Sequence, residues 1–158
     1  MHGYGVPDEI DGVLPWAWAE ERLAACRSYW LVTASADGRP HALPVWGVWL
    51  HDPDRFAFSC APGSRKARNL RANPRASVAA DSTVECVSVE GRACEISGDE
   101  REPAIEAYVA KYEPDPVGRG VLADFLRDNA VFVLTPERAF GIVERPGEFA
   151  ERATRWVW

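Results

Sequence analysis

Residues 63–75 read GSRKARNLRANPR and describe a short basic helix between two strands. Pro62-Gly63 ends the preceding strand, and Ser64 is a good N-cap for the helix. Asn73-Pro74 ends the helix, because the residue before a proline is disfavoured in helical geometry. The pattern therefore predicts a helix that begins directly after Ser64 and stops at the Asn-Pro pair.

The first turn of this helix is expected to bind an anion. Arg65 and Lys66 lie beside backbone N–H groups without intrahelical acceptors, at the positive end of the helix dipole. Cations are normally unfavourable there, by about 0.3–1 kcal/mol each. Together with the Ser64 hydroxyl, these groups form a donor set suited to a phosphate. The alternative interpretation is a solvated basic helix face.

The charge distribution favours a small anionic ligand over a nucleic acid. Between Arg55 and Ala80 the chain has six cations and no carboxylate. The whole chain has 18 Lys and Arg against 24 Asp and Glu, so the remainder has 12 cations and 24 carboxylates. This excess of negative charge would repel a polyanion. We therefore expect a single small molecule that carries a phosphate.

Length and composition predict one globular domain over residues 1–158. No apolar run approaches the ~20 residues of a membrane span, and the N-terminus lacks the regions of a signal peptide, so we expect a cytoplasmic protein. The four cysteines have no metal-binding spacing and are expected to be reduced and mostly buried. No metal site is predicted, because no histidine has a suitable carboxylate spacing.

The hydrophobic pattern predicts a mostly β, α+β domain, an antiparallel barrel with peripheral helices. The expected strands are residues 29–35, 40–50, 55–60, 76–80, 84–97, 130–134 and 139–143, and the tail 153–158 has strand propensity. The last two are expected to form a hairpin around residues 135–137. Besides the basic helix, we expect helices over residues 15–27, from a capping box at Ser97 to about Lys111, and over residues 121–127.

The strand expected over residues 40–50 is unusual because it contains Pro40, Pro44 and Gly47. Proline is confined to sheet edges or bulges, and a glycine inside a strand often marks the close approach of another backbone or a ligand. A barrel corner and a ligand contact explain this pattern equally well. We interpret His41, on the same strand, as a packed or rim histidine rather than a catalyst.

The order of these parts resembles the pyridoxamine-5′-phosphate-oxidase-like, FMN-binding split β-barrel superfamily. Within this superfamily, the chain looks most like the branch of flavin and deazaflavin oxidoreductases that are common in actinobacteria. The likeness covers about residues 30–97 and the tail. The segments that carry it are Asp37–His41, Pro44–Trp49, Ser64–Leu70, Asn73–Arg75, Val89–Ala93 and Thr154–Trp156.

The resemblance implies a split barrel of six or seven strands that forms a homodimer, with two cofactor sites at the subunit interface. In such proteins the Ser-Arg-Lys turn, here Ser64, Arg65 and Lys66, holds the cofactor phosphate, which agrees with the charge argument. Other segments would complete the site. The further cofactor-binding residues implied are Ser59 and Cys60 along the phosphate and ribityl chain, Val45, Trp46 and Gly47 beside the tricyclic ring, and Arg155 and Trp156 from the partner subunit.

The resemblance further implies an oxidoreductase that transfers a hydride between a flavin-type cofactor and a small, planar, unsaturated organic molecule. Between FMN and the deazaflavin coenzyme F420, the aromatic strand 46–49 and the Thr-Arg-Trp tail favour F420 slightly. Arg68 and Arg71 would meet its acidic tail or be solvated. No acid–base dyad or nucleophile is apparent, so no catalytic residue is assigned.

Three departures from the family argue against vitamin B6 oxidation. Residues 41–48 replace a basic strand of the true pyridoxamine phosphate oxidases, Cys86 stands where they carry a glutamine, and their C-terminal Arg-x-His motif is not visible. The alternative function is a non-catalytic carrier of a cofactor or tetrapyrrole in the same pocket. A nucleic-acid binder comes third, because the net charge disfavours it.

Overall fold

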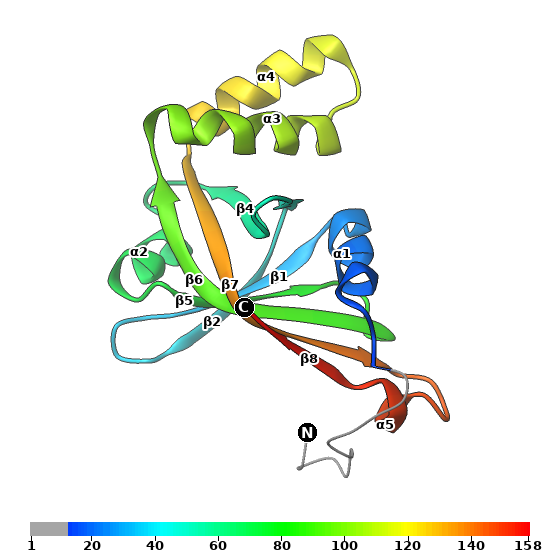
Figure 1. Ribbon diagram of the computed structural model, residues 1–158. Coiled ribbons are helices and arrows are strands. Elements are labelled where there is room, and N and C mark those ends of the chain that lie inside the picture. Colours follow the sequence, from blue (N-terminus) through cyan, green and yellow to red (C-terminus); the bar gives the residue numbers. More distant parts are fainter. Residues whose placement is uncertain (1–12) are drawn as a thin grey trace.

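The computed structural model describes residues 13–158 as one curled antiparallel sheet surrounded by helices (Figure 1). The strands are β1 (Tyr29–Ala34), β2 (Pro40–Val45), β3 (Gly47–Leu50), β4 (Arg55–Cys60), β5 (Arg75–Ala80), β6 (Glu85–Ile96), β7 (Ala130–Val143) and β8 (Thr154–Val157). The helices are α1 (Trp16–Ala25), α2 (Arg65–Ala72), α3 (Arg101–Tyr112), α4 (Pro116–Arg127) and α5 (Phe149–Arg152). This confirms the mostly β split-barrel fold, with one more strand than the six or seven expected.

The sheet has two separate edges, so the barrel is split. The strand order is β2-β1-β5-β6-β7-β4-β3, and β8 pairs with β7 outside this path. The single strand expected over residues 40–50 is therefore wrong: it breaks at Trp46, and its halves pair with β1 and β4. A Cβ on Gly47 would lie 2.2 Å from the Phe56 ring and 2.8 Å from the carbonyl oxygen of Ala57. The barrel-corner interpretation of this glycine is confirmed.

The hairpin expected around residues 135–137 is also wrong, because β7 runs through it as one strand of 14 residues. β6 is long enough to pair along this whole length, and a register shift between Glu90 and Gly91 accommodates Pro136. A Cβ on Gly91 would lie 2.0 Å from the carbonyl oxygen of Thr135, so only glycine permits this approach. Proline is tolerated here because the ladder is already irregular.

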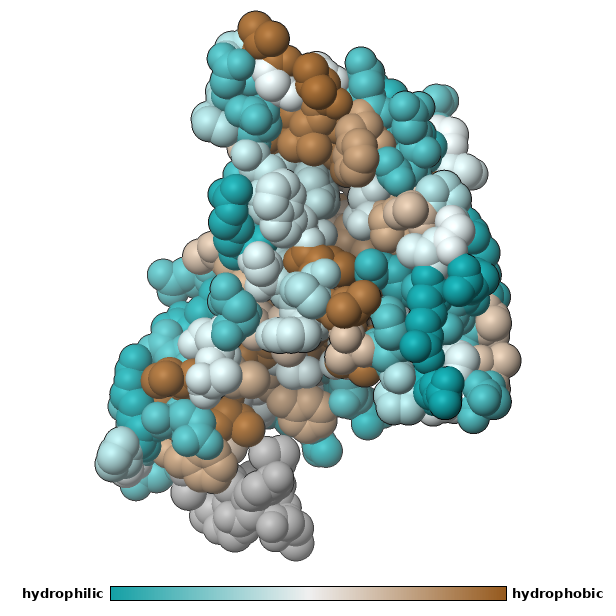
Figure 2. Space-filling model, turned by 180° about the vertical axis from the view of Figure 1, so that it is seen from behind, coloured by the Kyte–Doolittle hydropathy of each residue, from teal (hydrophilic) through white to brown (hydrophobic). Residues whose placement is uncertain are grey.

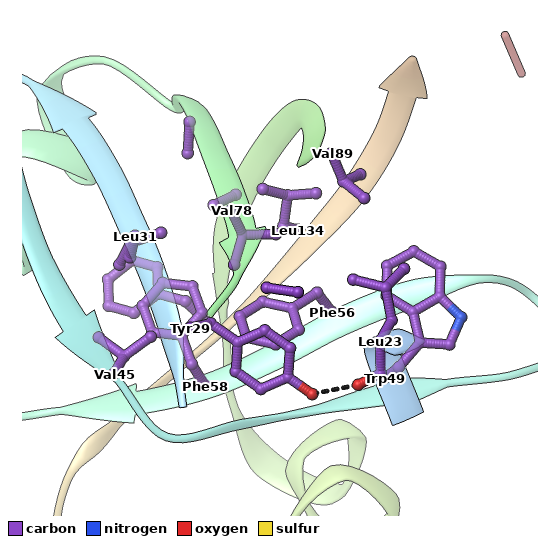
Figure 3. Close-up of a cluster of buried hydrophobic side chains, with 14 of the residues drawn as sticks. Leu23, Tyr29, Leu31, Val45, Trp49, Phe56, Phe58, Val78, Val89 and Leu134 are labelled. Carbon is purple, nitrogen blue, oxygen red and sulfur yellow. Dashed lines mark hydrogen bonds between the residues drawn. The ribbon is translucent and has the colours of Figure 1, made fainter. Parts of the chain in front are cut away.

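Two hydrophobic clusters lie on opposite faces of β4. Phe56 and Phe58 point into the barrel, where they pack with Tyr29 and other buried side chains (Figure 3). Between them, Ala57 points the other way, into a second cluster formed with α3 and α4. α3 and α4 therefore cover the outside of this part of the sheet (Figure 1).

The helix boundaries follow from local capping chemistry. Ser97 makes no side-chain cap, so the expected capping box is wrong; a 3-10 turn occupies Gly98–Glu100 before α3. α4 begins five residues earlier than expected, because Asp115 caps it through the backbone N–H of Gly118 and a proline follows at the first position. Within the described part of the chain, no helix is long and apolar enough to cross a membrane.

All four cysteines are free thiols, as expected. The expectation that they are mostly buried is wrong, since only Cys26 is buried. Cys60 and Cys86 are half-buried, and Cys94 is exposed. Cys94 and Glu95 are exposed together near the end of β6, where regular inside–outside alternation stops.

Candidate functional site

The basic helix α2 is held rigidly against the sheet, as the sequence pattern predicts. The Ser64 hydroxyl accepts a hydrogen bond from the backbone N–H of Ala67 at 3.3 Å and caps the helix. Ala67 and Leu70 are buried in the barrel core. On the same side of the helix, the buried amide of Asn69 donates to the hydroxyl of Thr33 in β1 at 3.0 Å. The N-terminus of α2 is therefore presented in a fixed position.

The cations of α2 divide into two pairs with different roles. Arg71 binds Glu95 at 2.7 Å and the carbonyl oxygen of Pro62, and Arg68 binds the carbonyl oxygen of Gly63. Within residues 13–158, Arg65 and Lys66 have no hydrogen-bonding or ion-pairing partner for their side chains. The first pair secures the turn before the helix, and the second pair remains available to a ligand.

His41 lies at the rim of this basic helix start. It is half-buried and pairs in register with Thr33, the residue that anchors α2. Partial burial lowers the pKa of His41, and the charges of Arg65 and Lys66 lower it further, so the neutral imidazole is favoured. Leu43 follows on the same face of β2, and 44% of its surface is exposed. An uncharged face therefore adjoins the two free cations.

The two residues expected from the end of β4 point to opposite sides. The Cys60 thiol packs against the barrel core; burial raises its pKa, while a hydrogen bond with Ser64 and the charge of Lys66 oppose this. Ser59 faces a cavity of about 10 Å³ beside α3, where its buried hydroxyl has no hydrogen-bond partner. The structure thus brings Cys60 to the helix start but directs the side chain of Ser59 away from it.

Val45, Trp46 and Gly47 lie at the barrel corner, against α3. Val45 is buried in the core, and the Trp46 ring stacks on the Tyr112 ring with centroids 4.9 Å apart and planes 4° apart. The Gly47 carbonyl accepts hydrogen bonds from the Tyr112 hydroxyl at 2.8 Å and the Lys111 ammonium at 3.1 Å. Sequence reasoning missed Tyr112 and Lys111, which occupy the backbone groups of Gly47.

Arg155 and Trp156 lie in β8, away from α2 (Figure 1). Trp156 is half-buried: it packs edge-on against Trp16 at 5.4 Å and covers Gly141, on which a Cβ would lie 2.6 Å from the indole. Arg155 is exposed. Within one protomer these residues do not join Ser64, so a shared site requires a second copy of the chain.

Residues 17–142, which are most of this chain, match the protein family described as pyridoxamine 5′-phosphate oxidase. The chain belongs to this family. No curated protein matches the sequence.

Solved structures with the fold of the pyridoxamine 5′-phosphate oxidase family include several bacterial proteins. A conserved hypothetical protein, Rv2991 from Mycobacterium tuberculosis, is 21% identical, with a TM-score of 0.70 over 84% of this chain and 87% of that one. A heme binding protein from Mycobacterium smegmatis is 24% identical, with a TM-score of 0.69 over 92% of this chain and 59% of that one. A pyridoxamine 5′-phosphate oxidase-related, FMN binding protein from Nostoc punctiforme is 18% identical, with a TM-score of 0.63 over 94% and 99%. At these identities the likeness shows the fold alone.

The outer face of the sheet carries an exposed apolar surface, which we call the outer patch: Trp30, Val32, Ala42 and Pro44. Trp30 is 50% and Val32 37% exposed, and their register partners on β2 are Pro44 and Ala42. A separate apolar stripe follows α4, where Val117, Val121 and Phe125 are exposed; Figure 2 shows hydrophobic surface at this end of the molecule. Large exposed apolar surfaces commonly mark interaction sites.

The structure brings together three side chains of types that can ligate a metal, which the sequence did not predict. The ligand atoms of Glu20, His51 and Asp54 lie within 4.8 Å of one another, with the His51 Nδ1 3.0 Å from the Glu20 carboxylate. The Trp16 indole N–H donates to Asp54 at 2.9 Å. The sequence separation of Glu20 and His51 hid this cluster, which in this structure attaches the β3–β4 turn to α1.

Proposed function

We propose that this protein binds a flavin-type cofactor, FMN or the deazaflavin F420, by its phosphate, and catalyses hydride transfer to or from a small, planar, unsaturated organic molecule. The observation that carries this proposal is the pair of cations at the capped N-terminus of α2, Arg65 and Lys66, whose side chains have no partner among residues 13–158. Family membership supports the same cofactor class.

The donors at this helix start fit a phosphate. The guanidinium of Arg65 and the ammonium of Lys66 adjoin the first backbone N–H groups of α2, which have no intrahelical acceptor. Each charge-assisted bond to phosphate contributes about 1.5–3 kcal/mol. When bound, the cofactor would supply the hydride chemistry. The protein's part is to hold the phosphate and to place an apolar face, including Leu43, beside the reacting molecule.

The contacts of the α2 arginines bear on whether FMN or F420 is the better candidate cofactor. Arg68 and Arg71 are engaged by the turn before the helix and by Glu95, so they give little support for an acidic tail. The FMN binding protein from Nostoc punctiforme has a similar fold, which supports FMN as the cofactor. The stacked Trp46–Tyr112 pair suits a planar ring of either cofactor. Parallel titrations with FMN and F420 separate them.

A carrier of heme is the second candidate function, and His41 is the observation that favours it. A neutral imidazole beside two cations offers an iron ligand together with partners for the heme propionates. The heme binding protein from Mycobacterium smegmatis has the same fold. His41→Ala separates the candidates, because it should abolish the Soret shift of added hemin but leave FMN affinity within about threefold.

The cofactor proposal is tested by fluorescence or calorimetric titration of the full chain. Arg65→Ala and Lys66→Ala should each weaken cofactor binding by about one to two decades without lowering the unfolding temperature. Arg75→Ala, beyond the end of α2, is the control and should matter less. Equal weakening by all three variants would mean only a diffuse positive field. No weakening by Arg65→Ala or Lys66→Ala would refute the site.

Catalysis is distinguished from carriage by stopped-flow measurement. Protein loaded with reduced cofactor should pass its hydride to some quinone or enone faster than free cofactor does, because holding donor and acceptor together is worth up to about 7–11 kcal/mol. Across a broad panel of such acceptors, rates no faster than those of free cofactor would favour the carrier.

We also propose that the protein is a homodimer whose interface includes the outer patch. Because Arg155 is exposed and lies away from Ser64 within one protomer, the proposal assigns Arg155 of the partner subunit to a shared site. Light scattering at micromolar concentration should give about twice the chain mass. Trp30→Glu should give monomers with weakened cofactor binding, whereas Val117→Glu on the α4 stripe should not. A wild-type monomer would refute the dimer but not the phosphate site.

A further inference from the structure

A cavity of about 290 Å³ lies outside the barrel, beneath the first turn of α3. Its apolar walls are Leu50, Ile96, Ala104 and Val133, which border the second hydrophobic cluster. Its charged walls are Arg55, the first residue of β4, and Glu100, directly before α3. Since regular pockets for small molecules begin near this size, the cavity is large enough for a compact organic ligand.

The guanidinium of Arg55 has no partner in this cavity. Arg55 is half-buried, and its Nε atom is inaccessible to solvent without a hydrogen-bond acceptor. Within residues 13–158, its side chain takes part in no hydrogen bond or ion pair, although Glu100 lines the same cavity. A buried donor atom without an acceptor is costly, and such atoms are normally satisfied by an ion, a ligand or water.

Arg101 shows what a structural arginine looks like in this fold. Its Nε atom is also buried without an acceptor. Its Nη2 atom, however, donates to the carbonyl oxygens of Leu126, Arg127 and Asn129 at 2.7–2.8 Å. Arg101 thereby closes the C-terminal end of α4, where a cation is favourable. Among the described residues, the side chain of Arg55 makes no comparable contact that would hold the fold together.

We infer that this cavity binds a small organic monocarboxylate with a short apolar body. A planar guanidinium binds a carboxylate through two parallel hydrogen bonds, and the aliphatic walls take the body of the ligand. The carboxylate of Glu100 repels a second negative charge, which selects a monoanion over a phosphate dianion. This site is separate from the helix start at Ser64, and the inference does not depend on the cofactor proposed there.

The inference is tested by titrating the full chain with benzoate and hexanoate while recording the NMR spectra of isoleucine δ1 methyl groups. Ile96 lines the cavity and should shift with a saturable isotherm, whereas Ile142, on the outer face of β7, should not. Titration should reach about 50 mM, well above the dissociation constant of ~10 mM that nine ligand atoms give at about 0.3 kcal/mol per atom. Arg55→Gln should weaken binding at least tenfold, while Arg55→Lys should retain part of it.

Two further measurements keep the outcome unambiguous. Benzoate should raise the unfolding temperature of the wild type but not of Arg55→Gln, and that variant should fold at least as stably as the wild type, because it removes a charge without a partner. Lys66→Ala and added inorganic phosphate should leave benzoate binding unchanged. The inference is overturned if Ile96 never shifts, if Arg55→Gln unfolds the protein, or if Lys66→Ala or phosphate abolishes benzoate binding.

Discussion

Replacing Lys111 by methionine should change how the stability of this protein depends on pH. The Lys111 ammonium is half-buried between α3 and the barrel corner, where it donates to the Tyr29 hydroxyl at 2.6 Å and the Gly47 carbonyl at 3.1 Å. Burial lowers its pKa from 10.5 to about 8. Between these two values the unfolded chain binds more protons than the folded chain, so folding becomes more favourable as the pH rises.

The size of the effect follows from this difference in pKa. A full shift of this size corresponds to about 3 kcal/mol over the whole titration, and roughly half of that falls between about pH 7.5 and about pH 9.5. Because Lys111 keeps some solvent contact, screening reduces the expected gain in unfolding free energy to about 1 kcal/mol in this window. Below about pH 7.5 the ammonium is charged in both states and the gain is absent.

Chemical denaturation across this window measures the effect as a difference between the wild type and Lys111→Met. The difference matters because burial also raises the pKa of Cys26, Tyr29 and Tyr112, which by itself makes the fold less stable as the pH rises. These groups are present in both proteins and largely cancel. Lys111→Arg keeps the charge and should likewise lack the gain. If the wild type does not gain stability over both variants, Lys111 does not titrate as described.

Two other substitutions test the packing that positions the site. Gly91→Ala should destabilise the protein by about 3 kcal/mol in chemical denaturation, because its Cβ would lie 2.0 Å from the Thr135 carbonyl oxygen, whereas Gly63→Ala, with open space around it, should have almost no effect. Asn69→Ala should cost about 1–3 kcal/mol and weaken cofactor binding, because it frees the buried hydroxyl of Thr33 and loosens α2; unchanged affinity would show that α2 is held by its apolar contacts alone.

The helix start at Ser64 could be predicted because every determinant is local. The N-cap, the Asn-Pro stop and the first-turn cations lie within residues 63–75, and short-range geometry alone decides where the helix begins. The fold class could likewise be predicted, because alternating strands and turn residues recur along the chain.

Features that depend on distant partners could not be predicted in this way. The hydrogen bond from the Tyr112 hydroxyl to the Gly47 carbonyl joins residues 65 positions apart in the sequence. The continuity of β7 depends on a register shift in β6, its neighbour in the sheet. The direction of Ser59 was available in principle, since alternation from Phe56 and Phe58 sends Ser59 to the opposite face. Family resemblance assigned the position but could not supply the orientation.

The six cations between Arg55 and Ala80 show why charge alone cannot define a site. Only Arg71 has a carboxylate partner among the described residues. Arg68 binds a backbone carbonyl, Arg55 lines a separate cavity, and Arg75 is exposed beyond the end of α2. Within residues 13–158, the side chains of Arg65 and Lys66 have no partner. A solvated basic face would gain little from leaving carboxylates out of the whole segment, since exposed ion pairs are nearly neutral in energy. The absence of carboxylates from this segment leaves its cations available for the two anion sites that we propose, a phosphate site at Arg65 and Lys66 and a carboxylate site at Arg55.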